Sequence, residues 1–198
     1  MKLIPVFAAL CAAVPSLAQS FDASFWTRST AGTTTPIPWV TGTAKGVFLD
    51  GRWAFDAPKT GGAYVGKTFT LWEKSITLIP EGGALFGKET GFGPELLALT
   101  SHGKWSTFSQ WQYVKGIRGS DSFAYGWAHL LREVFPGVKL GADAQSFYIR
   151  GGHQPQTDVG PCVQFETHGM YFRAWSAWSV GALNRGNPTL FVGIGYAR

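Results

Sequence analysis

Charged residues and cysteine are both scarce in this chain. Asp, Glu, Lys and Arg make up 15% of its 198 residues, whereas soluble domains contain roughly 25%. The two cysteines are Cys11 and Cys162. Cys11 lies in a segment that we expect to be removed, so no internal disulfide is predicted. The formal net charge is +5, yet no five consecutive residues carry like charges, and we predict no nucleic-acid-binding tail.

Long apolar runs are also missing. No apolar stretch after residue 18 reaches the length of a membrane-spanning helix, so no transmembrane helix is predicted. The hydrocarbon core of a bilayer satisfies no backbone hydrogen bonds, and only helices and closed β-barrels satisfy all of their own. If this chain crosses a membrane, it therefore has to cross as a closed barrel. The alternative is a soluble β-domain.

The sequence contains none of the common catalytic, metal-binding or nucleotide-binding motifs. Gly-x-Ser-x-Gly is absent, and neither His153 nor His168 has a serine at a diagnostic spacing. His-x-x-x-His, Cys-x-x-Cys and acidic calcium loops are absent as well. Gly-x-Gly occurs at 91–93 and 193–195, but no helix is predicted after either one. We therefore predict no catalytic residues, no metal site and no cofactor.

The first 18 residues are predicted to be a signal peptide. Lys2 provides a positive start, and residues 3–14 are mostly apolar. Ser16-Leu17-Ala18 then matches the small-x-small pattern of signal-peptidase sites. We expect export and cleavage after Ala18.

The remaining chain has the spacing of a β-rich protein. Residues 19–46 are rich in threonine and are predicted to be a polar leader, and residues 47–198 are predicted to form one β-barrel domain. That region divides into segments of about ten residues bounded by turn residues. Short and long connections alternate, which predicts tight turns and both chain ends on one rim, as in outer-membrane barrels. The predicted strands are Val47–Asp56, Ala63–Trp72, Ile76–Gly87, Phe92–Thr100, Trp105–Val114, Ser122–Phe135, Val138–Arg150, Val159–Glu166, Met170–Ser179 and Thr189–Tyr196.

Alternation along these segments indicates which face meets lipid. Successive side chains of a strand point to opposite faces, and one face is apolar and aromatic while the other is small or polar. A membrane barrel turns its apolar face outward and carries aromatic residues near its interfaces. We therefore predict an all-β fold, a closed antiparallel up-and-down transmembrane barrel of about ten strands within a range of eight to twelve. This reasoning places Phe123, Tyr125 and Trp127 on the outside. The predicted aromatic girdle is Trp53, Trp105, Trp111, Tyr113, Trp127, Tyr148 and Trp178.

Charged residues on the opposite face are predicted to line the lumen. They could form an ion-selective passage or a polar pocket, or they could pair with one another and fill a narrow barrel, because buried charges need partners. We favour a lumen filled by a paired network. The predicted network is Asp50, Arg52, Glu81, Glu95, Arg132, Lys139, Asp143, Glu166 and Arg173.

The last predicted strand carries a family resemblance. Leu190, Val192, Ile194 and Tyr196 occupy alternate positions and lead to an aromatic residue near the chain end. In this respect the chain resembles small bacterial outer-membrane β-barrel proteins. The resemblance implies a place among outer-membrane lipids and recognition of these four residues by the barrel-assembly machinery. We expect a structural or small-solute passage role without catalysis. A lipid-modifying outer-membrane enzyme and a soluble periplasmic barrel that binds an apolar ligand remain alternatives.

Overall fold

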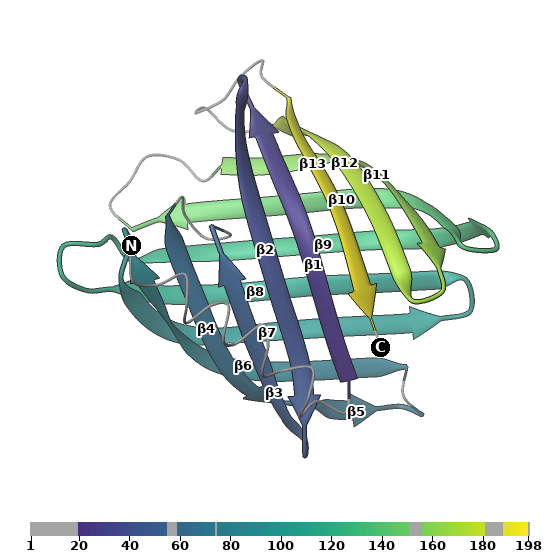
Figure 1. Ribbon diagram of the computed structural model, residues 1–198, viewed down its shortest axis with the longest axis horizontal. Helices are drawn as coiled ribbons and strands as arrows, with labels where there is room; N and C mark the ends of the chain where they lie inside the picture. The colour runs from purple at the N-terminus through teal and green to yellow at the C-terminus, as the bar shows by residue number, and fades with distance from the viewer. Residues whose placement is uncertain (1–19, 55–58, 74, 151–155, 181–187, 198) are drawn as a thin grey trace.

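Thirteen antiparallel β-strands make up the structure, a computed structural model that describes residues 20–54, 59–73, 75–150, 156–180 and 188–197 (Figure 1). The predicted signal peptide lies outside the described residues. No helix in the described part of the chain has the length and apolarity needed to cross a membrane. The strands are β1 (Ser20–Thr30), β2 (Thr33–Ala44), β3 (Val47–Trp53), β4 (Thr60–Lys67), β5 (Phe69–Leu71), β6 (Ile76–Gly87), β7 (Gly91–His102), β8 (Trp105–Gly116), β9 (Phe123–Phe135), β10 (Val138–Ile149), β11 (Gln156–Thr167), β12 (Met170–Ser179) and β13 (Thr189–Ala197).

Twelve of these strands close into a barrel. Each pairs with its neighbours in chain order, β4 pairs with β6, and β1 pairs with β13 from Asp22↔Ala197 to Thr30↔Thr189. The short strand β5 pairs with β6 alone, beyond the end of β4. Closure removes exposed sheet edges. The predicted fold class is therefore confirmed, with twelve barrel strands and one extra strand in place of about ten.

The predicted leader was wrong, because residues 20–44 form barrel strands β1 and β2. Ala31 and Gly32 join them in a two-residue turn in which both φ angles are positive, as twisted hairpins require. Pro36 and Pro38 fall where β2 pairs with β1 but has no register partner in β3. A proline is tolerated there because its missing N–H breaks no ladder bond on an unpaired side.

Both ends of the barrel sequence lie at one rim, as predicted. Asp22 near the start of β1 faces Ala197 at the end of β13. The same rim holds the two-residue turns Lys45–Gly46, Gly103–Lys104, Pro136–Gly137 and His168–Gly169, and we call it the short-turn rim. The opposite rim, the loop rim, holds most of the longer connections. The exceptions are the tight β1–β2 turn on that rim and the connection from β4 to β6, which contains β5 and lies on the short-turn side.

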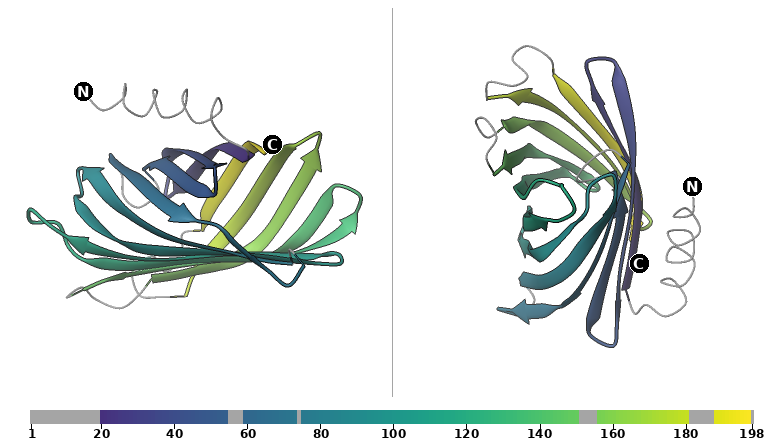
Figure 2. Two further views of the ribbon diagram at one scale, coloured as in Figure 1. Left: turned by 90° about the horizontal axis from the view of Figure 1, so that it is seen from below. Right: turned by 90° about the vertical axis from the view of Figure 1, so that its left-hand side faces the viewer.

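The barrel is flattened into two crossing walls. β1–β4 and β13 cross the strands β6–β10 behind them (Figure 1), and the second wall curves beneath the first in the turned views (Figure 2). Side chains of β2 and β9 meet across the lumen, since the rings of Trp39 and Trp127 lie 6.0 Å apart between centroids. These two strands stand opposite each other in the ring of twelve. The interior is therefore narrower than a round barrel of this strand number would leave.

Large apolar side chains cover the outer surface. They come from strands all round the barrel, and Trp111 with 59% exposure is among the most exposed. Such a surface would drive association in water, whereas it suits contact with lipid acyl chains. Its main members are Phe25, Val47, Val65, Phe92, Leu96, Trp111, Leu130, Leu140, Val159, Phe165, Phe172, Leu190 and Ile194.

Strand β9 reverses the predicted orientation. Phe123, Tyr125 and Trp127 are buried and point inward, whereas Gly126 faces outward beneath the ring of Trp111. The prediction failed because alternation separates two faces without saying which one is inside. A twelve-strand lumen that small residues alone lined would be left open, so bulky side chains from β9 fill it.

Candidate functional site

An ionic cluster lies on the lumen wall built by β3, β6, β7 and β8. Arg52 donates from both terminal nitrogens to the two carboxylate oxygens of Glu95, with 3.2 Å from Nη1 to Oε1. Gln110 Nε2 donates to Glu95 Oε1 at 2.7 Å. Asp50 Oδ2 lies 3.9 Å from Arg52 Nη1, and the side chains of this pair are 0% exposed. Bidentate guanidinium–carboxylate bonding fixes the position of Arg52 and Glu95 as well as stabilising them.

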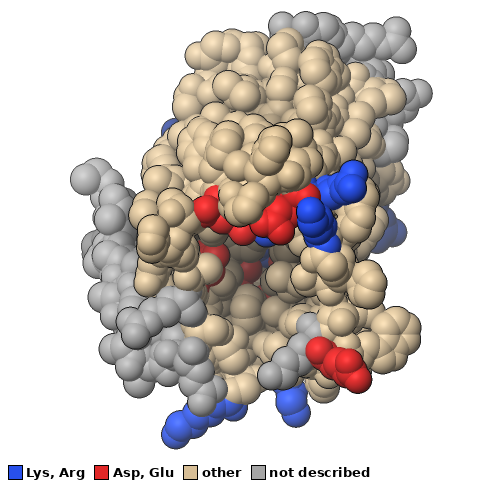
Figure 3. All heavy atoms as spheres, turned by 90° about the vertical axis from the view of Figure 1, so that its right-hand side faces the viewer, with Lys and Arg blue, Asp and Glu red and all other residues tan. Residues whose placement is uncertain are grey.

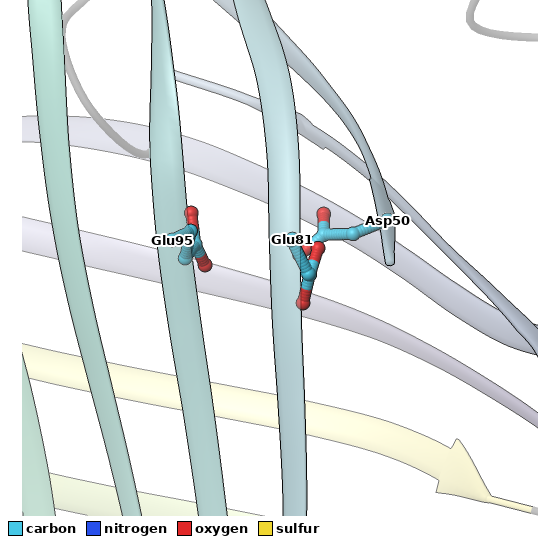
Figure 4. A group of neighbouring side chains, drawn as sticks. All are labelled: Asp50, Glu81 and Glu95. Carbon is cyan, nitrogen blue, oxygen red and sulfur yellow. The ribbon is translucent and has the colours of Figure 1, made fainter. Parts of the chain in front are cut away.

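Glu81 completes this cluster. It faces Glu95 in the register of β6 and β7, and its side chain lies next to the carboxylate of Asp50 (Figure 4). Glu81 is 6% exposed, and neither of its carboxylate oxygens has a hydrogen-bond partner among the described residues. We call Asp50, Glu81 and Glu95 the acidic cluster.

Four aromatic side chains bridge the lumen, and we call Trp26, Trp39, Phe108 and Trp127 the aromatic bridge. Trp127 is central, with its ring centroid 5.9 Å from that of Trp26 and 5.1 Å from that of Phe108. All three indole N–H groups anchor the bridge. Trp39 donates to Asp50 at 2.9 Å, Trp127 donates to Asp143 at 2.7 Å, and Trp26 donates to Ser24 at 3.0 Å. Hydrogen-bonded indoles hold a defined orientation.

Trp26 fits into the bridge because its register partner in β13 is a glycine. A Cβ on Gly193 would overlap the Trp26 ring. Glycine in a strand interior often marks such a close approach.

A second polar group lies on the wall formed by β9, β11 and β12. Arg173 Nε donates to Gln164 Oε1 at 2.5 Å, and Arg173 Nη1 donates to His129 Nδ1 at 2.9 Å. The guanidinium carbon of Arg173 lies 5.6 Å from the centroid of the Trp26 ring, within the range of cation–π contacts. The ionic cluster and the Arg173 group therefore lie on different walls of the lumen, with the aromatic bridge between them.

Cavities lie on both sides of the bridge. The larger, about 480 Å³, contains Asp22 and Ala197 in its lining, which places its mouth at the short-turn rim. Figure 3 shows the hollow on this side, with acidic side chains around and within it. A smaller cavity of about 20 Å³ lies beyond the bridge. Trp26 and Trp127 line both cavities, so these two rings form the partition between them.

Most residues of the predicted lumen network do lie inside the barrel. Asp50, Arg52, Glu81, Glu95, Asp143 and Arg173 are buried in it. Lys139 and Glu166 form a 2.6 Å ion pair and are partly exposed.

Arg132 was predicted to line the lumen, and this prediction was wrong. It lies on the exposed outer face of β9, with its guanidinium carbon 5.5 Å from the Trp105 ring centroid. Its misplacement follows from the reversed orientation of β9.

The predicted girdle needs one correction as well. Trp127 is buried in the lumen, where its N–H reaches Asp143. The other girdle residues lie on the outward face, and their role at a membrane interface stays a prediction. They are Trp53, Trp105, Trp111, Tyr113, Tyr148 and Trp178.

The sequence reasoning missed three members of the aromatic bridge. Trp26 and Trp39 lie in the residues assigned to the leader, and Phe108 lies in a predicted strand without an assigned role. In β1 and β2 the available signal would have been the period of two that places Trp26 on one face with Ser24, and Trp39 on one face with Ile37 and Thr41.

Comparison with solved structures relates this fold to outer-membrane channels. The KdgM porin superposes with a TM-score of 0.61 at 8% identity, over 88% of this chain and 98% of that one. The NanC porin gives a TM-score of 0.63 at 10% identity, over 89% and 98%. An outer-membrane channel from Pseudomonas putida F1 gives 0.59 at 12% identity, over 92% and 96%. The chain has the fold of a porin-type barrel. No protein-family model matches the sequence, and no curated protein sequence matches it.

Proposed function

We propose that this protein lies in a bacterial outer membrane and lets small solutes cross through a narrow lumen. The observation that carries the proposal is the pair of cavities separated by Trp26 and Trp127 inside a closed barrel with an apolar exterior. His129, Gln164 and Arg173 line the larger cavity and supply hydrogen-bonding positions for a hydrophilic solute. The aromatic partition restricts this path, so a solute that crosses has to be small.

The membrane location rests on the outer surface. Outward apolar side chains are found on strands from β1 to β13, and a barrel is one of the two backbone arrangements that hydrocarbon permits. On β13, Leu190, Ile194 and Tyr196 are exposed, and Val192 shares their face. We propose that these four residues contact outer-membrane lipid and form the signal for the barrel-assembly machinery. Export by the residue 1–18 signal peptide belongs to the same proposal.

Liposome swelling tests the passage role. We expect vesicles that contain the folded protein to admit glycerol-sized solutes and to exclude trisaccharides, because the partition leaves little open cross-section. The shift between unheated and boiled protein on a detergent gel shows that the barrel is folded. A folded barrel that admits neither solute would contradict passage and favour a purely structural role.

A charge on the outer surface tests the membrane location. Val163 lies in the interior of β11 on the outward face. We expect Val163→Arg to reduce the free energy of unfolding in lipid vesicles by about 2–4 kcal/mol. Val138 lies on the same face of the barrel at the short-turn end of β10. Val138→Arg is therefore the matched control, with an expected cost of about 0–1 kcal/mol. Equal costs in urea titrations would contradict a bilayer around these strands.

A further inference from the structure

The acidic cluster has the spacing of a metal-binding site. Asp50 from β3, Glu81 from β6 and Glu95 from β7 each offer one carboxylate oxygen, and these oxygens all lie within 4.8 Å of one another (Figure 4). All three side chains are buried. They come from separate strands, so the register of the barrel, and not a local loop, brings them together.

The charge of the cluster is unbalanced. Asp50, Glu95 and Arg52 are the charged side chains that act on Glu81, so one guanidinium stands against three carboxylates. Arg52 is committed to Glu95 through two hydrogen bonds. Glu81 has no partner at either oxygen within the described part of the chain. Buried carboxylates are normally paired or bound to a metal, and Glu81 has neither arrangement with any residue that the structure describes.

We propose that Asp50, Glu81 and Glu95 bind a divalent cation of the size of calcium, with Glu81 as the principal ligand. Calcium takes oxygen ligands at about 2.3–2.6 Å, so two ligands on opposite sides of the ion are at most about 5 Å apart. The spacing in this cluster fits that limit. Magnesium demands near-octahedral geometry and gives up its waters reluctantly, so a buried cluster of protein carboxylates favours calcium. A double positive charge also offsets the excess charge of the cluster.

The larger cavity lies next to the acidic cluster. Ile79 and Leu97 line that cavity, and they stand two residues from Glu81 and Glu95 on the same faces of β6 and β7. Trp39, which also lines the cavity, donates its indole N–H to Asp50. A bound ion would link β3 to β6 and β7, although β4 lies between β3 and β6 in the sheet.

Isothermal titration calorimetry on the full chain in detergent tests the site. After chelator treatment, we expect one calcium ion to bind per chain, and magnesium to bind at least tenfold more weakly. Glu81→Gln keeps the shape of the side chain and removes its charge, and we expect it to weaken calcium binding at least tenfold. Glu89→Gln, on the loop rim outside the cluster, removes one charge elsewhere and should bind calcium like the parent protein.

Thermal unfolding provides a second measurement. Calcium should raise the melting temperature of the parent protein and of Glu89→Gln, but not that of Glu81→Gln. The gel shift confirms that each variant is folded. No binding to the parent protein at millimolar calcium would overturn the proposal. Equal binding by Glu81→Gln would overturn it too, since that result would place the ion on bound lipid or elsewhere. Solute entry into vesicles is measured separately from calcium binding. A failure of the calcium proposal would therefore not decide the passage proposal.

Discussion

Trp127→Ala is expected to increase ion conductance through the barrel in planar bilayers severalfold. Trp127 holds the centre of the aromatic bridge, contacts Trp26, Trp39 and Phe108, and lines both cavities. Replacing its indole by a methyl group joins the two spaces and leaves Asp143 without the N–H that it accepts. Truncating a buried tryptophan also costs about 3–5 kcal/mol of stability. Single-channel recording measures the first effect, and urea unfolding in vesicles measures the second.

Trp178→Ala is the matched control for Trp127→Ala. Trp178 lies on the outer face with 55% exposure, so its removal leaves the lumen unchanged. We expect the conductance of this variant to equal that of the parent protein. If Trp127→Ala conducts no better than Trp178→Ala while its barrel is folded, the two rings do not limit the passage.

Arg52→Met is expected to destabilise the barrel by about 3–5 kcal/mol, because removing one partner leaves uncompensated buried charge. Arg52 is fully buried, bonds both oxygens of Glu95 and lies over the Tyr64 ring with its guanidinium carbon 4.4 Å from the centroid. Methionine has a similar length and fills much of the space, so the loss of charge dominates the result. Equilibrium unfolding in lipid vesicles measures the difference.

Two further variants separate charge from packing at this position. Arg132→Met removes an exposed arginine from the outer face and should cost less than about 1 kcal/mol. Arg52→Met combined with Glu95→Gln should recover part of the lost stability, because the excess negative charge falls by one. An Arg52→Met cost no larger than that of Arg132→Met would show that Arg52 does not balance the acidic cluster.

Local patterns were sufficient to predict most of the strands from Val47 onward. Ile76–Gly87 and Met170–Ser179 match β6 and β12 from end to end, because turn residues bound them on both sides. The segment Ala63–Trp72 was predicted as one strand but forms β4 and β5, separated at Thr68. The division between β4 and β5 is set by where β4 stops pairing with β6. A pattern within residues 63–72 alone could not predict it.

The missed features depend on contacts between distant residues. β1 and β2 have threonine- and proline-rich sequences, and pairing with β13 and β3 holds them in the sheet. The inward orientation of β9 follows from the width of the lumen, which no single strand encodes. The acidic cluster joins positions 50, 81 and 95 through the pairing of Glu81 with Glu95 and the closure of β4 on β6. A search for short ligand motifs could not find it.

The β1–β13 pairing makes completion of the barrel a late event. Its members are far apart along the chain, as the 165 positions between Thr27 and Val192 illustrate, whereas nearly all other pairings join consecutive hairpin strands. Bringing such remote segments together carries the largest loop-closure entropy in the molecule, and contacts of this kind slow folding. Until β1 and β13 pair, the edges of these two strands remain exposed and can aggregate. Unfolding is therefore expected to begin by parting β1 from β13.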